Sequence, residues 1–591
     1  MFSASSPRGI HRHPAVGAAF FSTVHSISHS ERLHLWPKNF PSLSIADDGN
    51  QFSRSWQFWL VGHSPLYLSI AGHSAASSVE GCRQGIPGYD ISEQLSIENN
   101  QLGIVWTANE IAEAVGGHVI KLGPSGSIST DTRTLQSGQW FLALTGPRFD
   151  GHDFLHSALA KGCAGVVGNK VYDGWPLGFV QVDGSTLISL QRLGASARKK
   201  FRGPVVGITG SAGKTTTRAM VSLALEPLGH IHQTSGNQNN HIGVPLSLLA
   251  MPLFSKACVL EMGMNHLGEI QELSRISEPS VRVVLNVGPA HMENFRSLEE
   301  VARAKGEIVL EARPGDICLM NADDPLVMNL PIPDGVQRVL FGSKVGCDVR
   351  LIAAQSTQGG CAVQVTLEHC SSVNSLLGYE SKRKSMRESI GLEGDTNSKS
   401  SSLRVVFEIP SPGLHLAMNA CAAGAVAVSL GIPLPQVGKS LANFRPAKMR
   451  LNIENCKNEI RIINDAYNAN PVSMVAALEL LHSIDCKGRR VAILGDMLEL
   501  GKFGKKAHLD VIKLCLELGI ELVGIAGLQF MEAIKVADLT SAEFSVISAL
   551  DSESLASQIG KKFTAGDVVL VKGSRGMRME VIVDVIRSID V

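Results

Sequence analysis

Apolar runs alternate with helix-compatible segments along most of the chain after residue 203. These runs are PVVGITG, KACVLEMG, VRVVLNVG, GDICLMNADDP and RVLFG, and each has the length of a buried strand. Short apolar runs separated by helical segments are typical of βαβ units, whose strands pair in parallel. The pattern therefore predicts an α/β fold with a mainly parallel central sheet over residues 203–445.

Two further segments of regular structure flank this central part. After NFRPAKMR, the runs RIINDAY, RRVAILGDM, LVGIAG and DVVLVKGSRGM predict a separate Rossmann-like α/β domain over residues 446–591, although no Gly-x-Gly-x-x-Gly fingerprint occurs. Before residue 203, TANEIAEAVGG is typical of a short helix closed by glycine, and SISTDTRTLQSGQWFLALTG is strand-like. Residues 101–202 are therefore predicted to form a small mixed α/β domain.

Two stretches of the chain lack this alternation. Residues 370–403 are rich in Ser, Lys, Glu and Gly, which predicts a low-complexity, partly disordered surface insertion that turnover does not need. Residues 1–46 contain a single acidic residue, Glu31, among many serines and basic residues. This is the composition of an organelle transit peptide. We expect residues 1–100 to be a transit peptide with a disordered extension, directing the protein to the chloroplast or alternatively to the mitochondrion.

The overall composition narrows the class of protein. The chain of 591 residues is 44% hydrophobic and 18% charged, with a formal net charge of zero. Nothing in this balance favours nucleic acid or an anionic membrane as a partner. No apolar stretch reaches the length of a membrane span, and the eleven cysteines include no Cys-x-x-Cys pair. We expect a soluble, reduced protein with no nucleic-acid partner and no membrane insertion, most simply a monomer.

The segment GITGSAGKTTTRAM joins a predicted strand to a predicted helix through a glycine turn. Backbone N–H groups at such a turn point at phosphates, a lysine reaches the outer oxygens and a hydroxyl binds Mg²⁺. Lys214 and Thr215 stand where this mechanism needs them, although the general pattern has glycine where this chain has Ile208. The alternative is an ordinary glycine turn. The predicted nucleotide contacts of the loop are Gly210, Ser211, Ala212, Gly213, Lys214, Thr215 and Thr216.

Polar residues follow the next strands of the predicted sheet. The segment SGNQNNHIG concentrates amides that suit a polar substrate, although it could be a solvated turn. Glu261 ends an apolar strand, where a buried carboxylate is costly unless a cation such as Mg²⁺ offsets its charge. His291 and Lys305 follow the next strand. Each is a weak signal alone, but their joint order predicts one site at the carboxyl ends of the strands.

In this order, GITGSAGKTT, NQNNHIGVPLSLL, LEMGMNHLGEI, AHMENF, ARAKGEI, NADDP, NDAYNANPVSM and LGDMLELG resemble the Mur ligase family of peptidoglycan synthesis. The resemblance covers residues 105–591 apart from the insertion, and TGSAGKT is the family's own form of the phosphate loop. It implies a UDP-substrate domain, a central ATPase domain and a C-terminal domain that delivers the amino substrate. NDAYNANPVSM resembles the member that adds D-alanyl-D-alanine to a UDP-N-acetylmuramoyl-tripeptide through an acyl phosphate.

The resemblance also implies roles for particular residues. It implies ATP, two Mg²⁺ ions and a carbamylated lysine at Lys305. The implied catalytic residues are Lys214, Glu261, His291 and Lys305, with Thr215, Glu261, His291 and Lys305 at the metals. Further nucleotide contacts would be Asn321, facing the adenine, with Arg450 and Asp465. The implied substrate contacts are Ser129, Asp131, Thr132, Arg133, Asn237, Asn239, Asn240, Asn468 and Asn470.

Two other functions fit parts of the sequence. A folylpolyglutamate-synthetase-like ligase shares the phosphate loop and the lysine, but AYNANPVSM and the Asp-Thr-Arg segment argue against it. A non-enzymatic structural or nucleoid protein of a plastid would more naturally have lost Lys214, Glu261 or Lys305, and all three are present. A nucleic-acid role also lacks a basic patch with interleaved aromatic residues.

Overall fold

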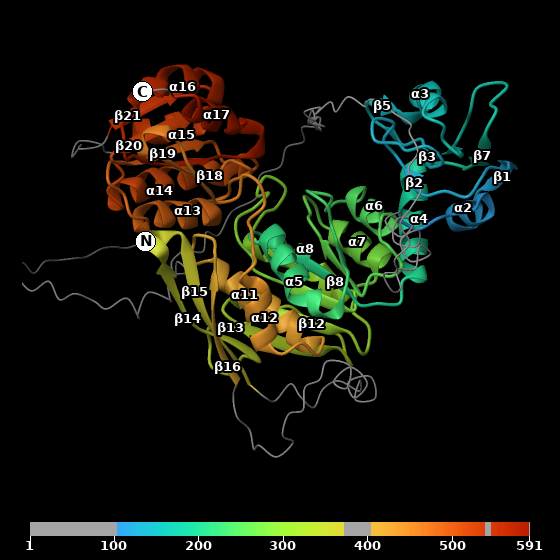
Figure 1. Ribbon diagram of the computed structural model, residues 1–591, viewed down its shortest axis with the longest axis horizontal. Coiled ribbons are helices and arrows are strands. Elements are labelled where there is room, and N and C mark those ends of the chain that lie inside the picture. Colours follow the sequence, from blue (N-terminus) through green and yellow to red (C-terminus); the bar gives the residue numbers. More distant parts are fainter. Residues whose placement is uncertain (1–102, 371–402, 538–544, 590–591) are drawn as a thin grey trace, which may run out of the picture. The chain divides into compact units, whose positions relative to one another are not determined.

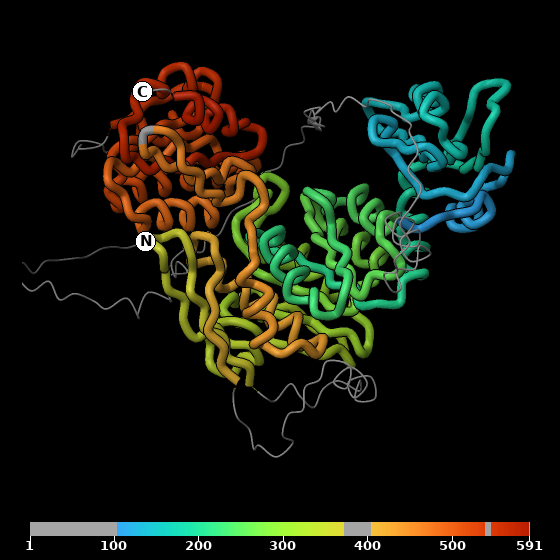
Figure 2. Tube along the Cα trace, in the orientation of Figure 1, coloured from blue at the N-terminus to red at the C-terminus, as the bar shows by residue number. Residues whose placement is uncertain are grey.

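The computed structural model describes residues 103–370, 403–537 and 545–589. The predicted transit segment and nearly all of the predicted insertion at 370–403 lie outside these residues. The chain forms three large sheets in succession, and each is completed before the next begins (Figure 2). The strands of each sheet lie inside the ranges predicted for the three domains, while the domain boundaries themselves stay predictions. Within the described residues, no helix is long and apolar enough to cross a membrane.

The first sheet is five-stranded, in the order β1-β7-β6-β3-β2. Its helix α2 (Ala108–Val115) begins with a capping box between Thr107 and Glu110 and ends at Gly116 with φ 69°, as the glycine in the sequence predicted. The strand-like segment that follows was predicted as one piece but contains three short strands, two in this sheet and a third, β4 (Thr145–Gly146), paired with β5 (Phe149–Asp150). A turn at Asp131, whose carboxylate accepts the Arg133 N–H, separates the two strands of this sheet. The other elements of this sheet are β1 (His118–Lys121), β2 (Ile128–Ser129), β3 (Trp140–Leu142), β6 (Gly165–Gly168), β7 (Gly178–Gln181), α3 (Leu155–Ala160) and α4 (Thr186–Lys200).

The central sheet has nine strands, in the order β16-β15-β14-β13-β12-β11-β8-β10-β9 (Figure 1). Its strands from β8 to β14 pair in parallel, as the alternating pattern predicted. The strands β15 and β16 extend the sheet in antiparallel fashion, and the sequence pattern did not reveal them. The strands are β8 (Val205–Thr209), β9 (Ile231–Gln233), β10 (Ala257–Glu261), β11 (Val281–Val284), β12 (Ile317–Asn321), β13 (Gln337–Gly342), β14 (Val349–Thr357), β15 (Ala362–His369) and β16 (Leu403–Ile409).

Helices cover both faces of the central sheet and complete two apolar cores. Because its strands are buried on both faces, they read as continuous apolar runs such as VVGIT. The helix α11 is alanine-rich and packs against both α5 and the sheet. The helices are α5 (Lys214–Leu225), α6 (Gly243–Leu249), α7 (Glu269–Ser277), α8 (Leu298–Leu310), α9 (Pro325–Met328), α11 (Leu416–Ser429) and α12 (Leu434–Leu441).

The third sheet is six-stranded, in the order β17-β18-β22-β19-β20-β21. Four of its strands were predicted, and the edge strands β17 and β21 were not. All pairs except β17 with β18 are parallel, as in a Rossmann-like domain. The elements are β17 (Asn452–Asn455), β18 (Arg461–Asp465), β19 (Arg490–Gly495), β20 (Leu522–Ala526), β21 (Ser545–Ala549), β22 (Val568–Lys572), α13 (Pro471–Ser483), α14 (Gly504–Glu517), α15 (Leu528–Val536), α16 (Ser552–Ile559) and α17 (Glu580–Arg587).

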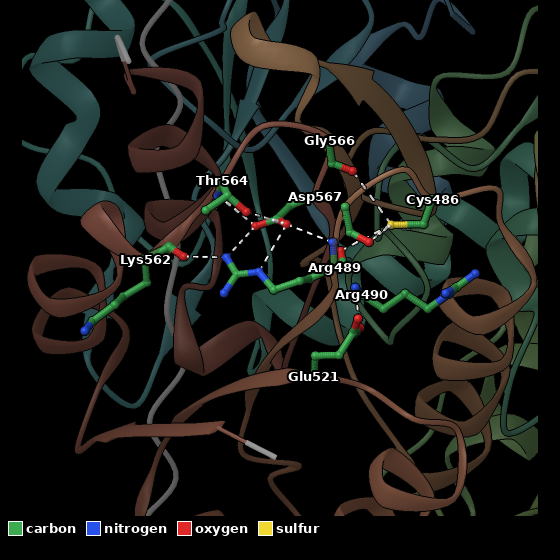
Figure 3. Close-up of polar contacts among 9 residues, drawn as sticks. Cys486, Arg489, Arg490, Glu521, Lys562, Thr564, Gly566 and Asp567 are labelled. Carbon is green, nitrogen blue, oxygen red and sulfur yellow. Dashed lines mark hydrogen bonds and ion pairs between the residues drawn. The ribbon is translucent and has the colours of Figure 1, made fainter. Parts of the chain in front are cut away.

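A buried carboxylate joins the beginnings of two paired strands in this third sheet (Figure 3). Asp567, fully buried just before β22, accepts hydrogen bonds from the N–H and Nη2 of Arg489, just before β19. It also accepts bonds from the N–H and hydroxyl of Thr564. Replacing Asp567 would leave these donors without an acceptor, which costs more than the net value of a single hydrogen bond.

We expect Asp567→Ala to lower the free energy of unfolding by about 2–4 kcal/mol. Burial alone would raise the pKa of Asp567, but the hydrogen bonds from Arg489 and Thr564 outweigh it and lower the pKa. A carboxylate with a lowered folded-state pKa stabilises the fold above its unfolded pKa, and that stabilisation is lost as the pH falls through the folded value. In denaturant unfolding, the difference in the free energy of unfolding between wild type and variant should therefore become smaller in acid. A difference that grows in acid would contradict this.

Candidate active site

The phosphate loop lies between β8 and α5, as the sequence predicted. Gly213 adopts φ 81°, and α5 begins at Lys214. Among the described residues, the N–H groups of Lys214, Thr215 and Thr216 have no hydrogen-bond acceptor, because they belong to the first turn of the helix. The ammonium of Lys214 donates to the carbonyl of Gly210 at 2.8 Å. Free N–H groups, a helix N-terminus and a lysine together form a binding site for an anion such as phosphate.

A second loop, which follows β11, holds the phosphate loop in shape. The side chain of Asn286 accepts the N–H of Ala212 at 2.9 Å and donates to its carbonyl at 3.1 Å. The hydroxyl of Ser211 donates to the carbonyl of Gly288 and accepts its N–H. The N–H of Ser211 donates to the carbonyl of Asn286. These contacts fix the loop, and the predicted nucleotide contacts of Ser211 and Ala212 stay a prediction.

Glu261 lies at the end of β10, beside the phosphate loop. Its side chain is 3% exposed, and one carboxylate oxygen accepts the Thr215 hydroxyl at 2.9 Å. The other accepts the side-chain amide of Asn239 at 2.8 Å. The N–H of Glu261 donates to the hydroxyl of Thr234 at 3.1 Å. The structure thus brings together three residues from separate sequence motifs that were predicted to belong to one site.

The oxygen atoms of Glu261 and Thr215 fit a magnesium ion. Mg²⁺ prefers hard oxygen donors and is commonly bound through one or two carboxylates together with substrate phosphates. The part of the chain that the structure describes contains no group of three or more His, Cys, Asp and Glu side chains that could enclose a metal by itself. The pair is therefore suited to an ion that shares its coordination with a bound nucleotide.

Lys305 projects from α8 into the interior and is 2% exposed. Its ammonium group has no hydrogen bond or ion pair with any described residue. Burial holds its pKa well below the usual value for lysine, and the nearby charge of Lys214 lowers that pKa further. Burial without a partner therefore favours the neutral amine form, which has a lone pair for chemistry.

His291 lies in the loop after β11 with φ 56°, a left-handed conformation that is uncommon outside glycine. Its Nδ1 lies 2.6 Å from the carboxylate of Glu499, and this hydrogen bond lowers the pKa of Glu499. No hydrogen bond joins His291 to Lys305 within the described ranges. The role of His291 at a second metal therefore stays a prediction.

Three residues predicted to contact the nucleotide are engaged with other parts of the protein. Asn321 is buried; its amide nitrogen donates to the carbonyl of Leu285 and its amide oxygen accepts the N–H of Asp323. Asp465 accepts the N–H of Leu451 and the ammonium of Lys572. The guanidinium of Arg450 lies over the ring of Tyr467, 4.3 Å from its centre. These contacts do not test whether the three residues bind a nucleotide, and that role stays a prediction.

The predicted substrate residues are of two kinds. Asn470 caps α13 by accepting the N–H of Ser473, and the side-chain oxygen of Asn240 accepts the N–H of Gly243, the first residue of α6. Asp131 and Arg133 form a paired, partly exposed turn, and the Arg133 hydrogen bond is the main cause that lowers the pKa of Asp131. Ser129 ends β2, Asn239 contacts Glu261 as described above, and Thr132, Asn237 and Asn468 lie in the same turns and loops as these residues.

One polar residue of the site was missed because it lies inside an apolar helix far along the chain. Asn419 projects from α11, and its side-chain oxygen accepts the hydroxyl of Thr217 at 3.2 Å. A Cβ atom at Gly213 would lie 2.7 Å from this oxygen, so glycine is required there for space as well as for φ. The signal in the sequence was the single asparagine in LAMNACAAGAVAVS, where a buried amide needs a partner.

Comparisons with known proteins agree with this geometry. Residues 208–427 match the Mur ligase middle domain, and residues 449–575 match the glutamate ligase domain of Mur ligases. The chain is 32% identical over 475 residues to the UDP-N-acetylmuramoyl-tripeptide–D-alanyl-D-alanine ligase of Bacillus subtilis (strain 168), covering 78% of this chain and 93% of the relative.

Two crystal structures are similar over most of this chain. MurF from Acinetobacter baumannii has a TM-score of 0.69 and 29% identity, covering 82% of this chain and 100% of its own. MurF from Thermotoga maritima, solved in complex with ADP, has a TM-score of 0.61 and 26% identity, covering 78% and 97%. With its phosphate loop, its buried carboxylate and its matched domains, this chain belongs to the Mur ligase family.

Proposed function

We propose that this protein is an ATP-dependent ligase that joins D-alanyl-D-alanine to UDP-N-acetylmuramoyl-tripeptide in peptidoglycan precursor synthesis. Three relatives that this chain matches over nearly all of their own length carry names that state this activity. The observation that carries the proposal is the cluster of Lys214, Thr215, Glu261 and Asn239 at the carboxyl ends of β8 and β10. This arrangement can hold a nucleoside triphosphate and neutralise its charge.

The residues of the cluster have distinct tasks in such a reaction. A carboxylate is a poor electrophile, so its oxygen first attacks the γ-phosphorus of ATP and ADP leaves, which yields an acyl phosphate. The amine of D-alanyl-D-alanine then attacks the acyl carbon, loses a proton and expels phosphate. Lys214 and the free N–H groups of α5 stabilise the transferring phosphoryl group, which is mostly a matter of position and charge. A bound Mg²⁺, held by Glu261 and Thr215, would supply further positive charge at the phosphates.

Carbamylation of Lys305 is a further part of the proposal. The neutral amine attacks the carbon of CO₂, a C–N bond forms, and one proton leaves, so that the side chain ends in an anionic carbamate. Two observations support it: the amine is buried, and it has no partner among the described residues. A carbamate would give this position an anionic group with two oxygen donors for a second Mg²⁺.

A reconstituted ligation assay tests the proposed activity. The full chain would receive ATP, Mg²⁺, UDP-N-acetylmuramoyl-tripeptide and D-alanyl-D-alanine, together and with each substrate omitted. We expect phosphate release to require both substrates and to match the formation of the pentapeptide product one for one. Phosphate release without either substrate, or ligation of glutamate to a folate in place of this product, would overturn the assignment.

We also propose that the protein acts in a plastid. The support is the acid-poor, serine-rich composition of residues 1–46, which lie outside the described residues. Residues 1–100 fused to a fluorescent reporter should carry it into chloroplasts, and an otherwise equal fusion of residues 101–200 should not. Cytosolic or mitochondrial fluorescence of the first fusion would contradict the proposal.

A further inference from the structure

Arg218 is a buried cation directly behind the phosphate loop. It lies one turn after Lys214 on α5, so that the two side chains share a face of the helix. Its side chain is 7% exposed, and Nη1 donates to the backbone carbonyls of Thr234 and Gly236. Its Nε is buried and has no hydrogen-bond partner among the described residues.

The two carbonyls belong to the segment 234–240, which follows β9 and reaches Glu261 at two points. The hydroxyl of Thr234 accepts the N–H of Glu261, and the side-chain amide of Asn239 donates to its carboxylate. The carbonyl of Asn239 also accepts the N–H of Gly263, just past the end of β10. Arg218 therefore binds the start of the segment that orients the Glu261 carboxylate.

Burying a guanidinium whose hydrogen bonds go only to carbonyl groups costs more free energy than holding a loop in place requires. Among the described residues, no carboxylate forms an ion pair with Arg218, and Glu261 is the acidic group whose charge favours its charged form. Because burial of an unpaired charge opposes folding, stability alone does not account for an arginine here. The cost is offset if the position serves the site that Glu261 forms with Thr215.

We propose that Arg218 is a positioning residue that fixes the segment 234–240 to α5, so that Thr234 and Asn239 hold Glu261 in place for Mg²⁺. The inference rests on the proposed magnesium role of Glu261. In this role Arg218 contacts the carbonyls of Thr234 and Gly236 and neither substrate nor metal. It acts through the backbone of the segment, and the side chain of Asn239 transmits the effect to the carboxylate.

Three variants separate positioning from a general loss of stability. Arg218→Met removes the donors and the charge, Arg218→Lys keeps the charge and the ability to donate, and Arg198→Met is the matched control. Arg198 also donates to backbone carbonyls, those of Ser277, Phe201 and Glu278, none of which is in the segment 234–240. Hydrogen exchange of peptides covering 234–243 measures the order of the segment without any ligand, and Mn²⁺ titration in the presence of ADP measures metal affinity without turnover.

We expect Arg218→Met to exchange faster at 234–240 and to bind Mn²⁺ in the ADP complex about tenfold more weakly, as is usual when a group that orients a metal ligand is lost. The Mg²⁺ concentration for half-maximal ligation should rise with it, while KM for D-alanyl-D-alanine stays unchanged. Arg218→Lys should recover most of both effects. Arg198→Met should lower the unfolding temperature and change neither readout.

Particular results would overturn the inference. If Arg218→Met keeps wild-type exchange at 234–240 and wild-type Mn²⁺ affinity, or if Arg198→Met changes both equally, Arg218 is only structural. If Arg218→Met does not fold, Arg218→Gln, which removes the charge and keeps only one short amide donor, takes its place in the comparison with wild type, and unchanged values in both assays reject positioning. Glu261→Gln tests the magnesium role separately, because wild-type Mn²⁺ affinity in that variant would show that the proposed metal site, and not only the Arg218 inference, is wrong.

Discussion

Lys305→Met should abolish ligation and leave the protein at least as stable as the wild type. The thioether side chain has similar volume, so it fills the space on α8 without a large cavity. It also removes a buried amine that has no partner among the described residues. Methionine cannot form a carbamate. We expect the ligation rate to fall by about three orders of magnitude or more, which is the usual scale when a single group that stabilises transition-state charge is lost.

Lys572→Met is the informative contrast for this result. Lys572 is equally buried, but its ammonium donates to the carboxylate of Asp465 and the carbonyl of Asn468. Removing it leaves a buried carboxylate unpaired, which should cost about 3–5 kcal/mol of stability. The unfolding temperature should therefore fall in Lys572→Met and stay the same or rise in Lys305→Met.

Carbamylation itself has a direct readout that does not depend on turnover. Wild-type protein in ¹³C-labelled bicarbonate should show a carbamate carbon resonance by NMR, and Lys305→Met should lack it. A wild-type ligation rate in Lys305→Met would show that the proposed role of this lysine is wrong. A spectrum without the resonance, together with an inactive variant, would instead assign Lys305 a role as an amine.

Glu261→Gln should lower ligation by about 10²–10⁴-fold while the fold is retained. The glutamine oxygen can still accept the amide of Asn239, and its nitrogen can donate to the hydroxyl of Thr215, so both hydrogen bonds of the wild type have a replacement. The variant loses the negative charge that suits this position to Mg²⁺. Activity should recover in part as Mg²⁺ is raised.

The unfolding temperature separates this effect from damage to the fold. Asp567→Ala, which removes another buried carboxylate, should lower stability and leave the Mg²⁺ dependence of ligation unchanged. Glu261→Gln should keep the wild-type unfolding temperature and change the Mg²⁺ dependence of ligation. A Glu261→Gln variant with the wild-type Mg²⁺ dependence would mean that this carboxylate is buried for a structural reason.

Local sequence determined most of the elements and the outline of the site. The helix at 108–115 carries its own start and stop signals in Thr107, Glu110 and Gly116, and hydrogen bonds within a few residues satisfy them. The phosphate loop is similarly local, because a buried strand, a glycine turn and a helix start lie within one short segment. Motif order then predicted that Thr215, Glu261 and Asn239 would lie at one site, since parallel strands bring their carboxyl ends to one edge, although their direct contacts were not predicted.

Only the tertiary structure decided which side chains hold that site together. Ala212 meets Asn286 across 74 positions of the chain, and Thr217 meets Asn419 across 202. In the sequence, Arg218 is an ordinary helix residue, and its contact with the segment after β9 arises only when α5 packs beside that segment. The strands β9, β14, β15, β16, β17 and β21 were likewise missed. A hydrogen bond between distant segments depends on how whole helices and strands pack, and a local pattern of apolar and polar residues contains no record of that packing.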